Sequence, residues 1–344
     1  MRLIEGLERL ELSKIASYPF LPEASKYVSE LGISPDDLVY RTEFAHARSR
    51  GAERVLDALE GNVFEEGGKI PILDHAKESR LVTELLSYPF SRMIISVIND
   101  PYLTRRFAVA EAKIAHRRLQ REPPSFTVYL GSDLGLDLDL ENDDRIRIHF
   151  LDYIRVSSIL RGIEWKLVNQ RIRKGWVILN FKDYLRVLQE FIRLKNEDGL
   201  PAKVSRGLKA GIEAYLPQIR EKLAVRTAQF EHEIAVVDPE KFPPCIRAMI
   251  RDISAGVNIS HSARFTLTTF LLNIGLSEED VIKIYRSSPD FDESKTRYQV
   301  KHIASKEYTP PSCSTIKTYG NCTATCPQPS HPLTIYKKAL ERGA

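Results

Sequence analysis

The sequence predicts a mainly α-helical protein with a small β component, divided into two domains. The chain has 344 residues, and at roughly 150 residues per domain this length suggests two domains. Apolar residues recur at helical spacing in the N-terminal part, whereas short runs with strand composition fall between residues 125 and 180. All four cysteines follow residue 244, so the last third of the chain has a chemistry of its own.

Three helices are predicted in the first 121 residues. Ser34 is a capping residue followed by a proline and two acidic residues, so we expect a helix over 36–59. A third helix is expected from Pro101 to Arg121, where two prolines end it. Spacings of three and four place a row of apolar side chains on one face of the helix between these two: Leu81, Leu85, Leu86, Phe90, Met93 and Val97.

The pattern changes to short strands after residue 124. Phe126–Leu130 and Gly175–Leu179 have strand composition, and Arg145–Ile148 alternates with a period of two. An amphipathic helix is expected over 182–195, followed by a turn-rich break. We place the domain boundary after this break, which gives an N-terminal domain of residues 1–210 and a helical C-terminal domain of residues 211–344.

Composition and charge are those of a globular protein. Hydrophobic residues make up 43% and charged residues 28%, which excludes a disordered or fibrous chain. The apolar runs are only a few residues long, whereas a membrane span needs about 20, and the N-terminus lacks the apolar core of a secretory signal. We therefore expect a cytoplasmic protein without membrane contact. The net charge is +4, and residues 241–344 carry 14 Lys and Arg against 9 Asp and Glu, a balance that permits a polyanionic partner.

The four cysteines form the clearest constellation. Cys245 is followed by Cys313, Cys322 and Cys326, so three of the four fall within 14 residues. In a reducing compartment such clustered thiols favour a metal or cluster over disulfides. Prolines precede Cys245 and Cys313 and follow Cys326, and they predict rigid, non-helical approaches. Four thiolates suit either tetrahedral zinc or an iron–sulfur cluster, and the spacing does not choose between them; four unrelated buried thiols are the remaining alternative.

Four motifs around these cysteines resemble a known family. Phe242–Arg247, His261–Phe265, Tyr298–His302 and Tyr308–Cys313 occur in the order and at the intervals of the iron–sulfur domain of the archaeal and eukaryotic DNA primase large subunit. The stretch from Leu151 to Phe191 is also similar to this family, but more weakly. The crowding of three cysteines near the end resembles the archaeal members, whereas eukaryotic members place the last cysteine far downstream.

The resemblance implies a regulatory, non-catalytic subunit of a heterodimer in DNA replication. In the family, a separate small catalytic subunit joins nucleotides into an RNA primer, and the N-terminal domain of the large subunit docks on it. The C-terminal domain holds a [4Fe-4S] cluster and binds DNA template, RNA primer and the 5′-triphosphate of the initiating nucleotide. Carried onto this sequence, the cluster ligands are Cys245, Cys313, Cys322 and Cys326.

The same resemblance points to the nucleotide-binding residues, and their chemistry agrees with that role. His261 and Arg264 match a motif that contacts phosphate, and their spacing places them on one face of a helix. Tyr298, Lys301 and His302 match a segment that lines the nucleic-acid site, where a tyrosine can stack and a lysine can pair with phosphate. The family has an arginine beside the matching histidine where this chain has Ser260. The lost phosphate contact could then come from Arg247.

A partner surface is predicted from apolar residues in the N-terminal domain. Phe150, Leu151, Tyr153 and Ile154 are too closely spaced for one element to bury all of them on a single face. We assign Tyr153 and Ile154 to the contact with the small subunit.

Three other interpretations of the sequence remain open. One is a zinc-stabilised adaptor that binds no nucleic acid. A second is a nucleotidyltransferase, because Asp137 and Asp139 would point to one face of a strand, although an exposed acidic loop is the simpler interpretation. The third is a nucleic-acid contact on the 101–121 helix, whose basic stripe comprises Arg106, Lys113, Arg117 and Arg121.

Overall fold

The chain folds into two compact units, Met1–Arg220 (unit 1) and Glu221–Ala344 (unit 2). The structure is a computed structural model that describes residues 10–61, 74–142, 145–157, 159–160, 163–235, 239–288, 290–323, 326 and 331–341. The division between the units lies within helix α11 (Pro217–Ala235). The boundary placed at 210/211 from the sequence falls earlier, within α10 (Arg206–Ile212).

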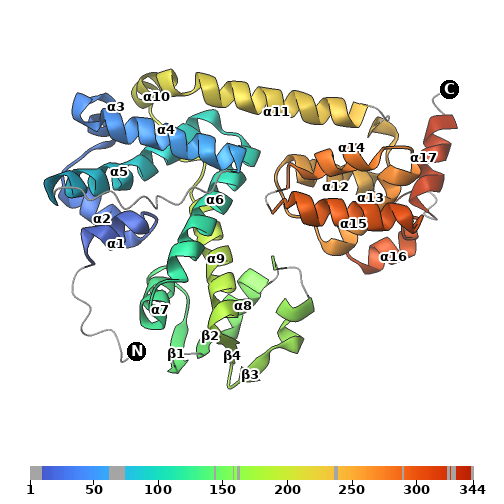
Figure 1. The fold of residues 1–344 in the computed structure, drawn as a ribbon, viewed down its shortest axis with the longest axis horizontal. Coiled ribbons are helices and arrows are strands. Elements are labelled where there is room, and N and C mark those ends of the chain that lie inside the picture. Colours follow the sequence, from blue (N-terminus) through green and yellow to red (C-terminus); the bar gives the residue numbers. More distant parts are fainter. Residues whose placement is uncertain are drawn as a thin grey trace. The chain divides into compact units, whose positions relative to one another are not determined.

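Unit 1 is mainly helical, with one small sheet (Figure 1). Short 3₁₀ turns join several of its elements, at Thr42–Phe44, Ile163–Trp165, Leu167–Asn169 and Glu213–Tyr215. Besides α10 and the start of α11, its helices are α1 (Leu12–Ser17), α2 (Pro22–Glu30), α3 (Pro35–Tyr40), α4 (Ala45–Glu60), α5 (Asp74–Ile98), α6 (Pro101–Leu119), α7 (Pro124–Asp133), α8 (Phe150–Ser157) and α9 (Phe181–Glu197).

The capping signal at Ser34 predicted a helix start correctly, but the helix expected after it is interrupted. Ser34 forms a capping box with Asp37 at the start of α3, and Asp100 caps α6. The helix expected over 36–59 ends at Tyr40 and resumes as α4, because Arg41 adopts an extended backbone. The buried guanidinium of Arg48 donates hydrogen bonds to the carbonyls of Leu38 and Arg41. These bonds satisfy backbone groups that the break leaves open.

The sheet has four antiparallel strands in the order β1-β2-β4-β3. They are β1 (Leu138–Asn142), β2 (Arg145–His149), β3 (Arg171–Arg173) and β4 (Trp176–Asn180). Alternate side chains of β2 and β4 are buried in one core cluster with residues of α7, α8 and α9. The strands expected at 145–148 and 175–179 are therefore confirmed. The strand expected at 126–130 is wrong: this segment is part of α7, where Pro124 occupies the first helical position and Thr127 and Leu130 are buried.

In unit 2 the described residues that follow α11 form helices and no strand. The helices are α12 (Pro244–Ser254), α13 (His261–Asn273), α14 (Glu278–Tyr285), α15 (Glu293–Ser305), α16 (Cys313–Thr318) and α17 (Pro332–Glu341), with a 3₁₀ turn at Pro239–Lys241. Their core includes three rings in edge-to-face contact, those of Phe242, Phe270 and Tyr336. The expected fold class, mainly α with a small β component, is confirmed.

One described helix is long and apolar enough to cross a membrane by length and composition. Residues Glu78–Ile98 of α5 have a mean hydropathy of 1.3, and half of that stretch is buried inside the structure. The core helix of a globular protein passes the same test, and α5 packs against α4 and α1. Its fully buried side chains include Ser87 and Ser91, which hydrogen-bond within the protein.

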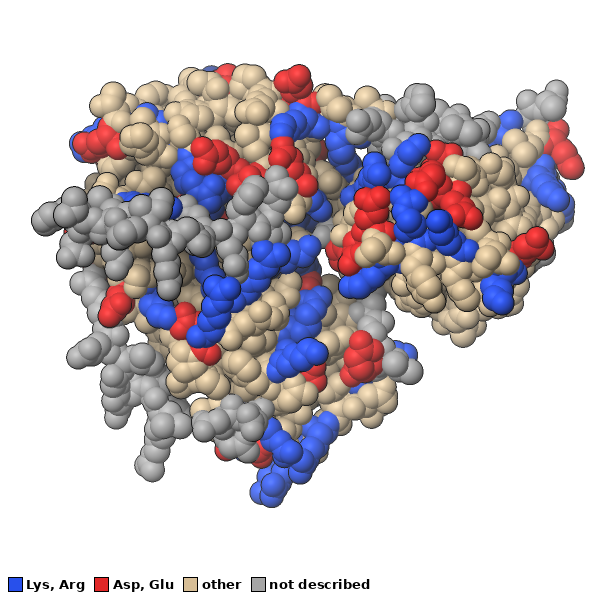
Figure 2. All heavy atoms as spheres, in the orientation of Figure 1, with Lys and Arg blue, Asp and Glu red and all other residues tan. Residues whose placement is uncertain are grey.

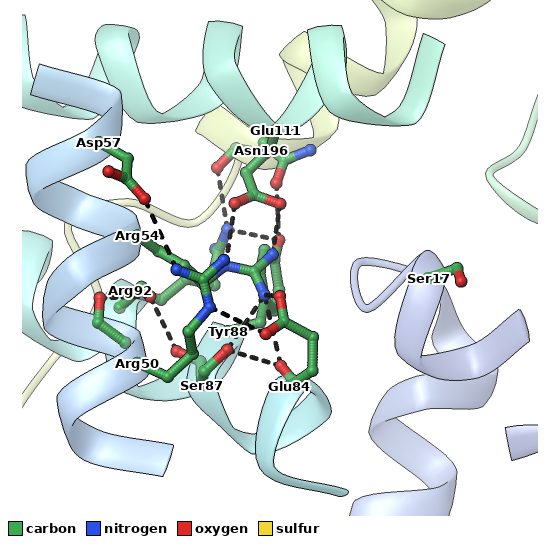
Figure 3. Close-up of polar contacts among 12 residues, drawn as sticks. Ser17, Arg50, Arg54, Asp57, Glu84, Ser87, Tyr88, Arg92, Glu111 and Asn196 are labelled. Atoms are coloured by element: carbon green, nitrogen blue, oxygen red, sulfur yellow. Dashed lines mark hydrogen bonds and ion pairs between the residues drawn. The ribbon is translucent and has the colours of Figure 1, made fainter. Parts of the chain in front are cut away.

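A buried guanidinium joins α4, α5 and α6 (Figure 3). Arg54 donates to both carboxylate oxygens of Glu111, at 3.1 and 2.7 Å, and to Glu84 at 2.8 Å. Only 6% of the Arg54 side chain and 5% of the Glu111 side chain is exposed. Burial raises the pKa of Glu84, but the charges of Arg54 and Arg50 outweigh it and leave that pKa lowered. Three helices therefore depend on one set of paired charges.

We expect Glu111→Ala to destabilise unit 1 by about 3–5 kcal/mol, because it leaves the Arg54 guanidinium buried with one partner removed. Glu53→Ala is the matched control: Glu53 is an exposed partner of Arg50 at 3.5 Å, and such pairs contribute about 0–1 kcal/mol. The midpoint of urea unfolding measures both variants. Similar small losses for the two would contradict a structural role for the buried pair.

A pair of carboxyl groups joins α2 to α7. Oε2 of Glu23 and Oδ2 of Asp133 are buried, and neither receives a hydrogen bond from a described group outside this pair of carboxyls. Burial, the hydrogen bond to Glu23 and the charge of that carboxylate raise the pKa of Asp133 to about 7. Burial acts to raise the pKa of Glu23 as well, but hydrogen bonds from Asp133 and Tyr129 leave it lowered. One proton shared between the two carboxyls satisfies both buried oxygens.

The raised pKa of Asp133 predicts a pH dependence of stability. In the unfolded chain its pKa is about 3.9, so the stabilisation from this proton is complete below about pH 4 and is lost as the pH rises to about 7. Asp133→Asn keeps a donor toward Glu23 and cannot ionise. We expect the melting temperature of this variant to exceed that of the wild type at pH 8 and to vary less between pH 4 and 7. Parallel pH profiles would refute the shared proton.

Candidate functional site

A pocket of about 460 Å³ opens in unit 2 between helices α13 and α15. Four of the five residues predicted to bind nucleotide line it, namely His261, Arg264, Tyr298 and His302. The other lining residues are Phe265, Thr268, Tyr285, Thr296, Gln299, Val300, Ile303 and Tyr308. Residues far apart in the sequence therefore meet at one concave surface, as in most small-molecule sites.

Helix α13 supplies the cationic side of the pocket. Ser260 caps this helix by accepting a hydrogen bond from the amide of Ala263 at 3.1 Å. His261 is the first helical residue and is exposed, and Arg264 follows one turn later. Because residues three apart share a helix face, both side chains reach the same pocket. The N-terminal end of α13 also carries the positive end of the helix dipole.

The guanidinium of Arg264 is held by acceptors on the neighbouring loops. Its Nη2 lies 2.6 Å from Oδ1 of Asn258 and 2.6 Å from Oδ1 of Asp290. The ring of Tyr285 lies 6.0 Å from the guanidinium carbon, and the Tyr285 hydroxyl donates to the backbone carbonyl of Arg264. Asp290 is half exposed, so an anion from solvent could replace its carboxylate without crossing the core.

Aromatic rings form the opposite side. The rings of Tyr298 and His302, one turn apart on α15, are nearly parallel, with an interplanar angle of 14° and centroids 6.3 Å apart. Tyr308 contacts both His302 and Phe265. Tyr298 is 72% exposed, which is a large exposed fraction for an aromatic residue. Exposed rings beside cations are the chemistry that stacks bases while binding phosphate.

Lys301 and Arg247 do not line this pocket. Lys301 is exposed on α15, and its charge helps to lower the pKa of the Glu279 carboxyl, after the hydrogen bond from Arg297. Arg247 lies 3.9 Å from Glu240 in an exposed ion pair. Sequence reasoning also missed Tyr285 and Tyr308 as lining residues and Asp290 as the partner of Arg264. Only Tyr308 carried a signal, because it belongs to one of the motifs.

All four cysteines lie in unit 2, as thiols rather than disulfides. Burial raises the pKa of the Cys245 thiol to about 11, and the thiols of Cys322, Cys313 and Cys326 add to this rise. All three are therefore close enough to Cys245 to act on its charge. Within the described part of the chain, no three His, Cys, Asp or Glu side chains are grouped closely enough to hold a metal ion.

Two of the cysteines begin helices, contrary to the non-helical approaches expected. Cys245 lies in the first turn of α12, after Pro243 and Pro244, and Cys313 is the first residue of α16, capped by Ser312. Pro244 starts α12, since proline is tolerated in a first turn, whereas Pro310 and Pro311 lie before the cap of α16. Free backbone N–H groups and the helix dipole at such ends stabilise thiolate. Pro327 lies outside the described residues.

The other candidate sites of unit 1 are engaged in structural contacts. Asp139 lies on strand β1 rather than in the expected acidic loop, and it pairs with Arg147 across the strands. The amide of Asp137 donates to Asp152. In the basic stripe of α6, Arg106 donates to the carbonyl of Ala58.

On the face shown in Figure 2, basic and acidic side chains are interspersed over unit 2.

Comparison with known proteins agrees with these motifs. Residues 42–205 match the family of eukaryotic and archaeal DNA primase, large subunit N-terminal domain, and residues 235–342 match the corresponding C-terminal domain. The DNA primase large subunit PriL of Methanococcoides burtonii is 42% identical over 339 residues, covering 95% of this chain and 92% of that protein. The chain belongs to the DNA primase large subunit family. PriL of Methanosarcina acetivorans is 39% identical, covering 96% and 89%, and PriL of Halobacterium salinarum 33%, covering 95% and 94%.

Family membership makes this chain a regulatory subunit of DNA primase that acts in DNA replication. A primase large subunit implies a small catalytic subunit as partner and involvement with DNA and RNA. The recognition made from the four cysteine-linked motifs is confirmed. Family membership favours this function over the two alternatives, a zinc-stabilised adaptor that binds no nucleic acid and a nucleotidyltransferase that uses Asp137 and Asp139.

Helix α8 places the two residues assigned to the small subunit differently. Tyr153 is fully buried, and its hydroxyl donates to the carbonyl of Trp165 at 2.8 Å. Its side chain is not available to a partner, which corrects that assignment. Ile154 is 41% exposed and Leu151, one turn earlier, is 57% exposed. The sequence could not set the phase of this helix, because the core that buries Tyr153 comes from α9 and the sheet.

Proposed function

We propose that unit 2 binds the 5′-triphosphate of the initiating nucleotide, together with DNA template and RNA primer, while the small subunit carries out nucleotide transfer. The observation that carries this proposal is the convergence of His261, Arg264, Tyr298 and His302 on one pocket. Arginine gives bidentate, charge-assisted hydrogen bonds to phosphate, and a histidine adds a donor. The neighbouring rings offer a stacking surface for a base or sugar.

A second site for the first nucleotide answers a kinetic need. Primer synthesis starts from two free nucleotides, and their encounter has a large entropic cost. A site that grips one of them by its triphosphate makes the first bond formation effectively intramolecular. In this arrangement Arg264 exchanges the carboxylate of Asp290 for phosphate, and His261 binds the same group from the preceding turn.

The cysteine set fits a [4Fe-4S] cluster. Its donors are four thiols, of which three act on the buried thiol of Cys245, and two of the four lie at helix starts. A tetrahedral zinc site would use the same four sulfurs, and the family to which the chain belongs favours the cluster in this proposal. When bound, the cluster links its four cysteines through iron–thiolate bonds.

The docking surface on the small subunit includes α8 in this proposal. Ile154 and Leu151 are exposed on consecutive turns, and adjacent apolar side chains on a helix surface are typical of protein contacts. We propose a heterodimer in which unit 1 carries this contact. Cytoplasmic localisation and the absence of membrane contact remain predictions from the sequence.

Arg264→Ala tests the triphosphate site. A charged hydrogen bond contributes about 1.5–3 kcal/mol, so we expect initiation by the reconstituted complex to fall roughly tenfold to more than a hundredfold. Extension of an annealed primer without a 5′-triphosphate should fall much less, because the small subunit performs the chemistry. The comparison requires both assays on the same preparation.

Two variants control this test. Arg297→Ala removes an arginine of α15 that pairs with Glu279 and Glu293 and does not line the pocket, and it should leave initiation near the wild-type level. Asp290→Asn removes the carboxylate that competes for Arg264 and should not mimic Arg264→Ala. Equal losses of initiation and extension in Arg264→Ala would point to misfolding, and no loss in either would show that the site is misassigned.

Cys313→Ser tests the cofactor. Anaerobically purified wild-type protein should be brown, with broad absorption at roughly 400 nm and bound iron. The variant should lose most of this absorption, the thermal stability of unit 2 and initiation together, because the cluster links Cys245 to a segment far along the chain. Ser314→Ala, beside the same cysteine, serves as the control. Stoichiometric zinc without iron would overturn the assignment.

A further inference from the structure

Asn321 forms a side-chain hydrogen-bond ring with the start of α13. Its Oδ1 accepts from Oγ of Ser260 at 3.1 Å, and its Nδ2 donates to Oγ of Ser262 at 3.0 Å. The two serine hydroxyls lie 3.1 Å apart and close the ring. The amide joins segments about sixty residues apart in the sequence. One end of this bridge is the residue next to Cys322, and the other flanks His261.

The α13 side of the ring sets the position of the proposed phosphate-binding residues. Ser260 is the helix cap, and its carbonyl accepts the amide of Arg264 at 2.8 Å. His261 lies between the two serines of the ring. Any movement of Ser260 and Ser262 therefore moves the first turn of α13, and with it His261 and Arg264.

The other side of the ring belongs to the cysteine segment. The backbone N–H of Asn321 donates to the backbone carbonyl of Ile316 at 3.0 Å, and Ile316 is buried in the core of unit 2. Ile316 lies on α16, the helix that begins with Cys313. Gly320 has a φ of +71°, which lets the chain turn back directly before Asn321. The backbone of Asn321, which lies between Cys313 and Cys322 in the sequence, is thus tied to α16.

We propose that Asn321 is a positioning residue that links the cysteine site to the phosphate-binding end of α13. This inference rests on the proposed function. The cluster proposed for the cysteines would hold the turn at Asn321, and this turn holds the cap of α13 in the conformation that binds phosphate. Coupling between two sites is reciprocal, so triphosphate binding also stabilises the cysteine site. The arginine that the family has at position 260 could neither cap α13 nor complete this ring. With Ser260, this chain lacks that direct phosphate contact but has the link to Asn321.

The test uses the full chain, purified anaerobically, with ATP as the probe. Two measurements are made: the dissociation constant for ATP, and the rate at which the absorption at roughly 400 nm is lost to an iron chelator with and without saturating ATP. In the wild type we expect ATP to slow this loss about threefold or more. Asn321→Ala should load its cysteine site, bind ATP about two- to tenfold more weakly, and lose the protection by ATP.

A second variant guards against a direct effect on Cys322. Ser262→Ala breaks the same ring from α13 and leaves Asn321 in place, and we expect the same weakening and the same loss of protection. Thr318→Ala is the matched control, because the Thr318 hydroxyl donates to the backbone carbonyl of Ser314 within α16. It should behave as the wild type.

The outcomes separate the two proposals. A wild type that binds no ATP would refute the triphosphate site itself. A wild type that binds ATP without protection of the absorption, or protection that persists in both Asn321→Ala and Ser262→Ala, would refute the link through Asn321.

Discussion

The buried guanidinium of Arg54 holds together the helices on which unit 1 is built. It bonds to Glu84 on α5 and to Glu111 on α6, and α6 in turn packs against α9 and the core that includes the sheet. A buried cation is tolerated only when its partners are all in place. We expect this requirement to favour one arrangement of the three helices over others. Such specificity suits a unit that must present an exposed surface, such as that of α8, in a fixed position.

Unit 2 solves the same problem with different chemistry. Its core contains three rings in edge-to-face contact, and the segment that carries the last three cysteines includes only the short helix α16 among its described elements. A six-residue helix such as α16 has little stability of its own. Burial of Ile316, thiol ligands and side-chain bridges are therefore the means available to fix it. The proposed phosphate site, on the long helix α13, then depends on contacts from the segment that the cysteines hold.

The success of sequence reasoning followed the range of the interactions involved. The start of α3 was predicted because Ser34 acts within the first turn of its own helix. The cysteine-linked motifs identified the family and four pocket residues because their residue types and order are specific. Segment 126–130 was misassigned because its residue types favour a strand, and this local preference is weaker than the packing of a proline-started helix against the core. Asp290 was invisible, since only the tertiary fold brings it to Arg264.

The contacts of Arg264 bear on which ligand the pocket can take. Its guanidinium already pairs with a carboxylate at 2.6 Å, so a ligand must replace that partner as well as reach the arginine. A neutral group cannot replace the charge of the Asp290 carboxylate, and a singly charged anion only substitutes for it, so neither gains much from the exchange. A triphosphate carries several charges, and His261 and the N-terminal end of α13 can bind charges that Asp290 leaves unmet. The acid thus favours a polyphosphate over smaller anions, while it keeps the guanidinium in the orientation that binding requires.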